Sequence, residues 1–340
     1  MTFVSVAIAT YDGERHVLEQ LESISGQTLR PLELIVCDDL STDRTVAIVE
    51  DFARRAPFSV RLHINEQRLG VGGNFMKAAG LCAGELIAFS DQDDVWLPHK
   101  LERCTARFED PNVVLAIHAC SVVGEEIDPQ KLIVPAGAAA DRVAPPLELP
   151  KWGEAPGMAM VFRRGLLLLS DWESRPVAHH QHGRLLHDEW VYGLARVAGS
   201  VAFIAEPLCL YRQHEANVEG APERGAATWA KNALTTGGVY YGRRAEQARQ
   251  WAALIERVAQ RSADEELAGR SRREAVSYRR LAQALEQRAL VYGPEESRRE
   301  RLRALVRAFA GGTYRSRRRE GFGLRGLTRD IAMIASGRIG

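Results

Sequence analysis

Residues 85–98 have the sequence Glu85-Leu-Ile-Ala-Phe-Ser-Asp-Gln-Asp-Asp-Val-Trp-Leu-Pro98, in which an aliphatic segment runs directly into three acids within four positions. A short apolar run that ends in polar residues is typical of a buried strand. We therefore expect a strand over Glu85–Ser90, with Asp91, Asp93 and Asp94 just beyond its carboxyl end. Single aspartates at strand ends are common, but this density of acids favours a functional role.

The sequence before this segment alternates between strand-like and helix-like hydrophobic periods. Apolar residues recur at helical spacing in residues 15–25 and 46–53, with Ser41 or Thr42 as the candidate cap of the second helix, and a third helix is expected over Asn74–Cys82. Three more aliphatic runs predict strands: Val4–Ala9, Leu32–Cys37 and Val60–Ile64. This order predicts an α/β fold with a Rossmann-like, mostly parallel sheet flanked by helices.

Acidic residues also follow the first two predicted strands. Thr10-Tyr11-Asp12 ends the first strand and Asp38-Asp39 ends the second, so carboxylates from three strands are expected at one edge of the sheet, where such folds bind ligands. Clustered carboxylates repel one another unless a cation is present. Oxygen ligands favour Mg²⁺ or Mn²⁺, which typically bridge substrate phosphates.

The chain is expected to change character twice after this half. Val113–Val123 predicts a long strand, residues 127–156 an irregular stretch, and Met158–Phe162 a further strand. Residues 1–220 carry 20 Lys+Arg and 31 Asp+Glu, whereas residues 221–340 carry 25 and 13. We expect one domain over 1–220, with two halves at 1–110 and 111–220, and a basic, arginine-rich helical region over 221–340.

Three segments together resemble the nucleotide-sugar half of family 2 glycosyltransferases, with the rhamnosyltransferase-like members most similar. They are Val6–Tyr11, Ile35–Asp43 and Ala88–Pro98, the last with a DxD motif. The resemblance implies a GT-A fold, with residues 1–110 for the nucleotide-sugar and residues 111–220 for the acceptor. It implies that Thr10, Tyr11 and Glu14 line the nucleoside pocket and that Asp39 holds the base. It further implies that Asp91 faces the ribose and Asp93 binds the metal, while Asp94 either helps the metal site or orients its neighbours.

The segment Arg68–Phe75 also fits this family, whose third loop carries glycines and an asparagine before a helix. The resemblance makes Asn74 a candidate donor-binding residue. A flexible turn that enters a helix explains the same glycines equally well.

A second polar cluster, His187-Asp188-Glu189-Trp190, supplies a candidate general base. Transfer to a hydroxyl with inversion needs one base near the acceptor. In the family an acidic pair or His-Asp before Trp occupies this place, so the resemblance assigns the role to Asp188, with Glu189 in reserve. The alternative is that Asp188 caps a helix over Trp190–Val197.

The third cluster is Tyr211-Arg-Gln-His-Glu-Ala-Asn217, directly after the aliphatic Pro207–Leu210. It resembles the family's late motif. On this basis His214 completes the metal shell or touches the diphosphate, and Arg212 binds phosphate oxygens.

The rest of the chain suggests where the protein works. Five cysteines without a CxxC pair argue against a disulfide framework, and no run is long enough to span a bilayer, which predicts a cytoplasmic protein. Amphipathic helices are expected over 226–260, 264–290 and Glu295–Ala310, followed by a basic patch at Arg315 and 317–319. Because no nucleic-acid motif is present, peripheral attachment to an anionic membrane suits these arginines, with a solvated helix face as the alternative.

The leading hypothesis is therefore an inverting, metal-dependent glycosyltransferase that uses a dTDP- or UDP-sugar donor and a glycan or lipid-linked glycan acceptor. A catalytically degenerate member that acts as a nucleotide-binding or membrane-associated scaffold is the alternative. A sugar-1-phosphate nucleotidyltransferase fits less well, because Thr10–Arg15 lacks the glycine-rich phosphate loop that class needs after its first strand.

Overall fold

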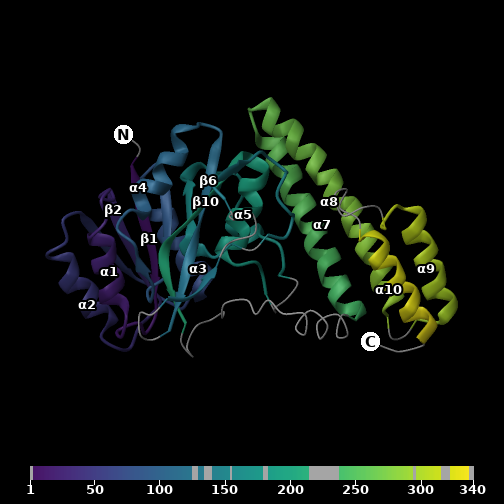
Figure 1. The fold of residues 1–340 in the computed structure, drawn as a ribbon, viewed down its shortest axis with the longest axis horizontal. Helices are drawn as coiled ribbons and strands as arrows, with labels where there is room; N and C mark the ends of the chain where they lie inside the picture. Colours follow the sequence, from purple (N-terminus) through teal and green to yellow (C-terminus); the bar gives the residue numbers. More distant parts are fainter. Residues whose placement is uncertain are drawn as a thin grey trace. The chain divides into compact units, whose positions relative to one another are not determined.

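A computed structural model describes residues 3–124, 129–133, 140–153, 155–178, 183–213, 237–293, 296–314 and 322–336 (Figure 1). The chain forms two compact units. The first contains residues 1–172 and 186–221, and the second contains residues 173–185 and 222–340.

The first unit is built on one mixed sheet with the strand order β3-β2-β1-β4-β9-β6-β10-β5. Its first four strands pair in parallel, as predicted: β1 (Val4–Thr10), β2 (Glu33–Asp38), β3 (Ser59–Ile64) and β4 (Leu86–Ser90). Almost every residue of β1, β2 and β4 is buried. These strands are aliphatic throughout because both of their faces are covered.

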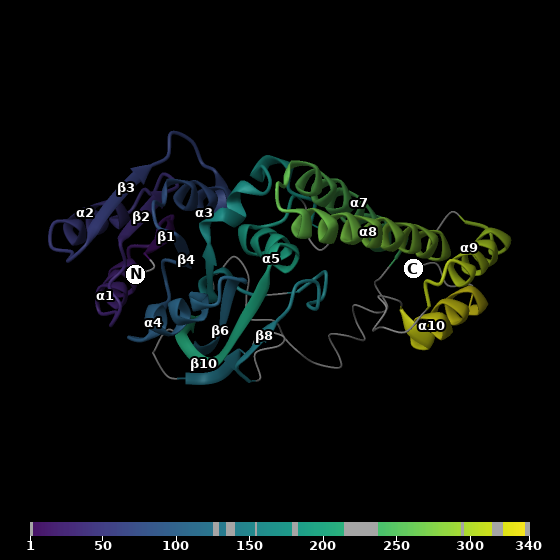
Figure 2. The same ribbon diagram turned by 90° about the horizontal axis from the view of Figure 1, so that it is seen from above.

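Three helices cover this parallel part of the sheet: α1 (Val17–Ser25), α2 (Thr45–Ala53) and α3 (Gly70–Leu81). Figure 2 shows α1 and α3 on opposite sides of β1 and β2. The predicted cap of α2 is wrong, because the Ser41 hydroxyl hydrogen-bonds to Asp38 and no side chain caps the helix. Helix α3 also begins one turn before the predicted Asn74, so the glycines at 70, 72 and 73 lie inside the helix.

The remaining strands extend the sheet with both orientations. Strand β6 (Val113–Val123) has its predicted bounds, and β9 (Met160–Arg163) joins it to β4 through antiparallel pairs. Strand β10 (Ser200–Arg212) runs parallel to β6 and antiparallel to β5 (Val95–Trp96). The stretch expected to be irregular contains two short strands, β7 (Pro129–Ile133) and β8 (Arg142–Ala144), because each pairs with a neighbouring long strand.

Short helices connect these strands. The two α-helices are α4 (Lys100–Thr105) and α5 (His187–Ala198), and α5 begins three residues before the predicted Trp190. The 3₁₀ turns are η1 (Ala106–Glu109), η2 (Gly157–Ala159), η3 (Arg164–Leu168) and η4 (Trp172–Ser174).

The second unit is helical. Helices α7 (Gly238–Arg261) and α8 (Glu265–Val291) form an antiparallel pair, since ion pairs join Arg249 to Glu286 and Arg279 to Glu256. Figures 1 and 2 show the last two helices, α9 (Arg298–Ala310) and α10 (Gly323–Ser336), side by side. Helix α10 was not expected from the sequence, and the basic patch at Arg315 and 317–319 lies outside the described residues.

A buried ionic cluster holds α10 to α8. The Asp330 carboxylate accepts hydrogen bonds from Arg288, at 2.6 and 2.8 Å, and from the hydroxyls of Tyr292 and Tyr314, both at 2.7 Å. Its charge is fully paired, which is what a buried carboxylate requires. The polar Arg288 and Asp330 thus fix the position of α10 in this unit.

Two chain-wide features complete the fold. All five cysteines are buried and free, as the sequence analysis expected. Among the described helices, none is both long enough and apolar enough to cross a membrane.

Candidate active site

The carboxyl ends of β1 and β2 are tied together by side chains. The Thr10 hydroxyl donates to the Asp38 carboxylate at 2.8 Å, and Asp38 also accepts from the backbone N–H of Ser41 at 2.8 Å. Both Thr10 and Asp38 are buried. Thr10 therefore shapes the end of β1, and its hydroxyl is directed at a neighbouring strand.

The side chain of Asp39 binds the backbone at the start of α3. Its carboxylate accepts hydrogen bonds from the backbone N–H groups of Leu69 at 2.7 Å and Gly70 at 2.9 Å, and from the Asn65 amide at 2.8 Å. Gly70 has φ of 71°, a conformation that glycine adopts at little cost. Asp39 thus fixes the loop that closes one side of the sheet edge.

Asn74 lies beneath this loop and is buried. Its amide nitrogen donates to the carbonyls of Cys37 at 2.8 Å and Thr10 at 3.2 Å, and its oxygen accepts from Asn65 at 2.9 Å. In this structure Asn74 joins α3 to the ends of two strands. The carboxamide of this third-loop asparagine therefore uses both its nitrogen and its oxygen in hydrogen bonds to the protein.

Tyr11 and Glu14 lie on the exposed side of the same edge. The Arg68 guanidinium carbon lies 3.6 Å from the centre of the Tyr11 ring, a close cation–π contact. The Glu14 carboxylate accepts from the backbone N–H of Arg44 at 3.0 Å. Sequence reasoning missed Arg68 as a site residue, since only its distance from Tyr11 reveals it.

The acids after β4 lie beside the start of α5. Burial, together with the nearby carboxylates of Asp93 and Asp188, raises the pKa of Asp91 to about 7. Asp188 is therefore close enough to Asp91 to act on it electrostatically, although 97 positions separate them in the sequence. The structure thus brings together the candidate base and the two acids of the DxD motif.

Arg212 holds the turn that carries these acids. Its backbone N–H donates to the Asp94 carboxylate at 3.1 Å, its Nε donates to the carbonyl of Asp93 at 3.0 Å, and its guanidinium pairs with Glu19. Asp94 is fully buried, and burial, Cys209 and the carboxylates of Asp91 and Asp93 raise its pKa well above the usual range. Asp94 thus orients the turn that carries Asp91 and Asp93 through its hydrogen bond to the Arg212 backbone.

Lys100 lies in the same buried region. Its Nζ donates to the Met158 carbonyl at 2.6 Å and lies 3.6 Å from the centre of the Trp96 ring. Burial lowers the pKa of Lys100, while its charge lowers that of Asp91. Lys100 therefore lies close enough to Asp91 to act on its carboxyl group electrostatically.

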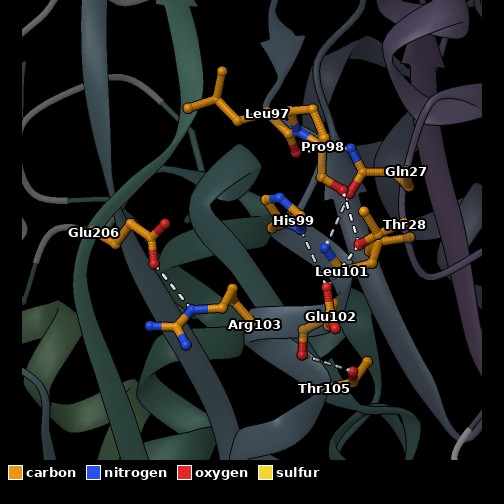
Figure 3. A network of polar contacts seen from close by, with 10 residues as sticks. All are labelled: Gln27, Thr28, Leu97, Pro98, His99, Leu101, Glu102, Arg103, Thr105 and Glu206. Atoms are coloured by element: carbon orange, nitrogen blue, oxygen red, sulfur yellow. Dashed lines mark hydrogen bonds and ion pairs between the residues drawn. The ribbon is translucent and has the colours of Figure 1, made fainter.

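The far end of the acidic segment is fastened to the loop between α1 and β2 (Figure 3). The Gln27 side-chain amide donates to the Leu97 carbonyl at 2.9 Å. The backbone N–H of Thr28 donates to the Pro98 carbonyl at 2.9 Å. The Thr28 hydroxyl also donates to Glu102 at 2.8 Å. Both ends of the acidic segment are therefore anchored.

His187, the first residue of α5, packs its ring against two phenylalanines. This ring stacks on Phe75 with centroids 4.0 Å apart and meets the edge of Phe89 at 4.8 Å. Neither ring nitrogen has a hydrogen-bond partner among the described residues, and burial lowers the pKa of His187 to about 3. His187 is therefore neutral and serves as a packing residue beside Asp188.

Asp188 does not cap α5, so that alternative is wrong. The helix begins at His187, which puts Asp188 in its first turn, where its Oδ1 accepts from the N–H of Glu189 at 2.8 Å. The Glu189 carboxylate instead accepts from the N–H of Leu186 at 3.3 Å. The two neighbouring acids thus have different surroundings.

The candidate metal ligands are only partly within the described residues. His214 lies outside them. Among the residues that the structure describes, no group of three or more His, Cys, Asp or Glu side chains is arranged to hold an ion.

Comparisons with known proteins agree with this fold, which is that of a GT-A glycosyltransferase. A family model described as glycosyl transferase family 2 matches residues 5–167. The chain is 30% identical over 226 residues to dTDP-rhamnosyl transferase RfbG of Shigella flexneri, a match that covers 63% of this chain and 74% of that protein. The chain belongs to glycosyl transferase family 2.

Two further matches have less coverage or less identity. UDP-Glc:alpha-D-GlcNAc-diphosphoundecaprenol beta-1,3-glucosyltransferase WfgD of Escherichia coli is 32% identical over 135 residues, which cover 38% of this chain and 52% of that protein. The crystal structure of S. aureus TarS 1-349 in complex with UDP-GlcNAc has a TM-score of 0.53 at 17% identity and covers 99% of this chain and 92% of that one. The chain spans between 37% and 74% of the first curated relatives it matches.

Proposed function

We propose that this chain is an inverting, metal-dependent glycosyltransferase that moves a sugar from a nucleotide-diphosphate donor to a glycan hydroxyl. The observation that carries the proposal is that Asp91 lies near both Asp93 and Asp188. Burial and the charges of these two carboxylates raise the pKa of Asp91. Members of this family that transfer sugars need these two functions, donor binding and a base, at one place.

The donor set of the site fits a divalent cation. Asp91 and Asp93 offer hard oxygen ligands, and the raised pKa of Asp91 means that one more positive charge would favour the ionised cluster. Mg²⁺ or Mn²⁺ commonly uses one or two carboxylates plus substrate phosphates, so a third protein ligand is not required. When bound, the cation would neutralise the departing diphosphate. Asp93 would hold it, and His214 remains a candidate ligand.

The other donor contacts follow from the edge of the sheet. In this proposal Tyr11, Thr10 and Glu14 would line the nucleoside pocket, Asp39 would hold the base, and Asp91 would face the ribose. Asn74 would keep its place among the donor-binding residues through the strand ends that it joins. Arg212 holds the turn that carries Asp93, and its contact with phosphate oxygens, which the family resemblance implies, stays part of the proposal.

Asp188 would act as the general base. As the acceptor oxygen bonds to the anomeric carbon, its proton passes to the Asp188 carboxylate and the bond from the anomeric carbon to the diphosphate oxygen breaks. The nucleoside diphosphate leaves on the opposite side, which inverts the anomeric centre. Asp188 lies in the first turn of α5, where helix geometry favours its ionised form.

The relatives suggest the substrates. Similarity to a dTDP-rhamnosyl transferase supports dTDP-rhamnose as the donor, with a UDP-sugar as the alternative. Similarity to an enzyme that acts on a diphosphoundecaprenol-linked sugar supports a lipid-linked glycan acceptor in bacterial surface polysaccharide synthesis. Such an acceptor would place this protein in the cytoplasm, at the inner face of the membrane.

A thermal-shift experiment with the full chain tests the donor and metal assignments. We expect dTDP or UDP to raise the melting temperature in Mn²⁺ and to have little effect in EDTA, because ligands of the native state stabilise it. Nuclear magnetic resonance of the product would then show an anomeric configuration opposite to that of the donor. Nucleotide binding without any transfer would favour the scaffold alternative, and no nucleotide binding would contradict the proposal.

A further inference from the structure

Helix α9 presents two different faces. Ala304, Leu305 and Ala308 are buried on one side, where α9 packs against α8 and α10. Arg301 is buried on the same side, and its guanidinium donates to the carbonyls of Gly293 at 2.7 Å and Glu296 at 3.1 Å. These contacts hold α9 in the second unit, and its opposite face takes no part in them.

The other face of α9 carries an exposed apolar stripe. Leu302, Val306 and Phe309 are 54%, 60% and 62% exposed. Their spacing of four and then three residues puts them on one side of the helix. Leu324 and Ile331 of the neighbouring α10, seven positions apart, are also exposed. Large apolar side chains grouped on a surface in this way mark an interaction site.

Arginines lie on both edges of this stripe. By helical geometry Arg298 falls on one edge, and Arg299 and Arg303 fall on the other. All three are exposed. Glu300 is the sole acid of α9, and its carboxylate accepts from the Ser297 N–H at 2.9 Å and hydroxyl at 2.6 Å. The exposed face thus combines apolar side chains with a clear excess of positive charge.

We propose that this face of α9 is a docking surface for an anionic lipid bilayer. An interfacial helix buries an apolar stripe below the headgroups, while flanking arginines extend to the lipid phosphates. A second copy of the chain fits less well, because it would bring these arginines against one another. This proposal rests on the lipid-linked acceptor proposed above, because the stripe and its arginines would hold the enzyme beside that acceptor.

Vesicle flotation with the full chain tests this surface. We expect binding to phosphatidylcholine vesicles that contain about one third phosphatidylglycerol, and about tenfold weaker binding to phosphatidylcholine alone. The combined change Leu302→Ser, Val306→Ser and Phe309→Ser should weaken binding to anionic vesicles about tenfold or more. The matched control is Leu168→Ser, which alters an 83% exposed leucine in the first unit and should leave binding unchanged.

A charge variant separates the arginines from the apolar stripe. Arg299→Glu with Arg303→Glu should also weaken anionic binding about tenfold, whereas Arg272→Glu with Arg273→Glu, on the exposed side of α8, should have a much smaller effect. Circular dichroism melting of each variant checks that the helices remain folded.

Three outcomes would overturn the proposal. They are equal binding of wild type to neutral and anionic vesicles, unchanged binding of the triple variant, and a wild-type dimer that the triple variant dissociates, which would make the occupant a second copy. Nucleotide thermal shifts on the same samples keep the two proposals apart. Loss of vesicle binding with intact nucleotide shifts refutes only the surface, whereas absent nucleotide shifts in wild type refute the enzyme assignment.

Discussion

The carboxamide of Gln92 pairs with the backbone of Tyr11, with its Oε1 2.9 Å from the Tyr11 nitrogen and its Nε2 3.0 Å from the Tyr11 oxygen. These two hydrogen bonds continue the pairing of β1 and β4 beyond the ends of both strands. A Cβ atom on Gly13 would lie 2.3 Å from the same Oε1, so any larger residue there would displace the Gln92 carboxamide. The residue between the two acids of the DxD motif thus sets the distance between that motif and the nucleoside side of the site.

We predict that Gln92→Glu weakens donor binding about tenfold, because the lost N–H leaves a carboxylate oxygen facing the Tyr11 carbonyl. Isothermal titration with nucleotide and Mn²⁺ measures the effect. Gln67→Ala, an exposed position in the loop before α3, is the control and should bind like wild type. Equal affinities for Gln92→Glu and wild type would show that this pairing does not position the donor site.

Asp188 and Glu189 should separate catalysis from helix capping. We expect Asp188→Asn to lower kcat by about 100- to 10,000-fold with donor affinity nearly unchanged, the effect of losing a general base. Glu189→Gln should keep most of kcat, because this side chain accepts from the Leu186 N–H at the start of α5. Steady-state kinetics with saturating donor measures both variants. Full activity in Asp188→Asn together with loss in Glu189→Gln would move the base to Glu189.

The strands and the acidic edge could be predicted from the sequence because both depend on local pattern. Aliphatic runs ending in acids define β1, β2 and β4, and the carboxyl ends of parallel strands meet at one edge. The partners of individual side chains could not be predicted in this way. The family resemblance makes Asn74 and Asp39 candidate donor-binding residues, but no local pattern indicated that each also holds backbone groups of distant segments.

Long-range pairing accounts for most of the remaining differences. Strands β7 and β8 are short and have weak patterns of their own, so only β6 and β10 reveal them as strands. Helix α10 was missed for a similar reason, because its position depends on the pairing of Asp330 with Arg288. The placement of Asp188 beside Asp91 came from the family resemblance, and sequence spacing gave no indication of it.

Arg212 offers a test between a structural and a ligand-binding role. We predict that Arg212→Lys lowers the free energy of unfolding by about 1–2 kcal/mol, because the partly buried carbonyl of Asp93 loses its Nε–H donor. Glu19→Gln removes the half-exposed partner and should cost less than about 1 kcal/mol. Urea unfolding measures both. A variant that keeps wild-type stability but loses nucleotide affinity would instead support direct contact between Arg212 and the diphosphate.

His187 should make the protein sensitive to acid. Burial lowers the pKa of this imidazole from 6.5 to about 3, so between these values the unfolded chain binds a proton that the native protein does not. The free energy of unfolding should therefore be unaffected by His187 above pH 6.5 and should fall by about 1.4 kcal/mol per pH unit as the pH drops toward 3.

The variant His187→Phe retains the ring that stacks on Phe75 but cannot titrate, so its unfolding free energy should fall less steeply between pH 7 and pH 5 in urea titrations. His118, whose pKa burial also lowers to about 3, remains in this variant and leaves part of the slope. His99→Gln, at an exposed position, is the control and should keep the wild-type slope. Because His187 does not change its protonation state near neutral pH, the pH dependence of kcat should be the same in His187→Phe and wild type. An unchanged stability slope in His187→Phe would mean that this imidazole is protonated in the native protein.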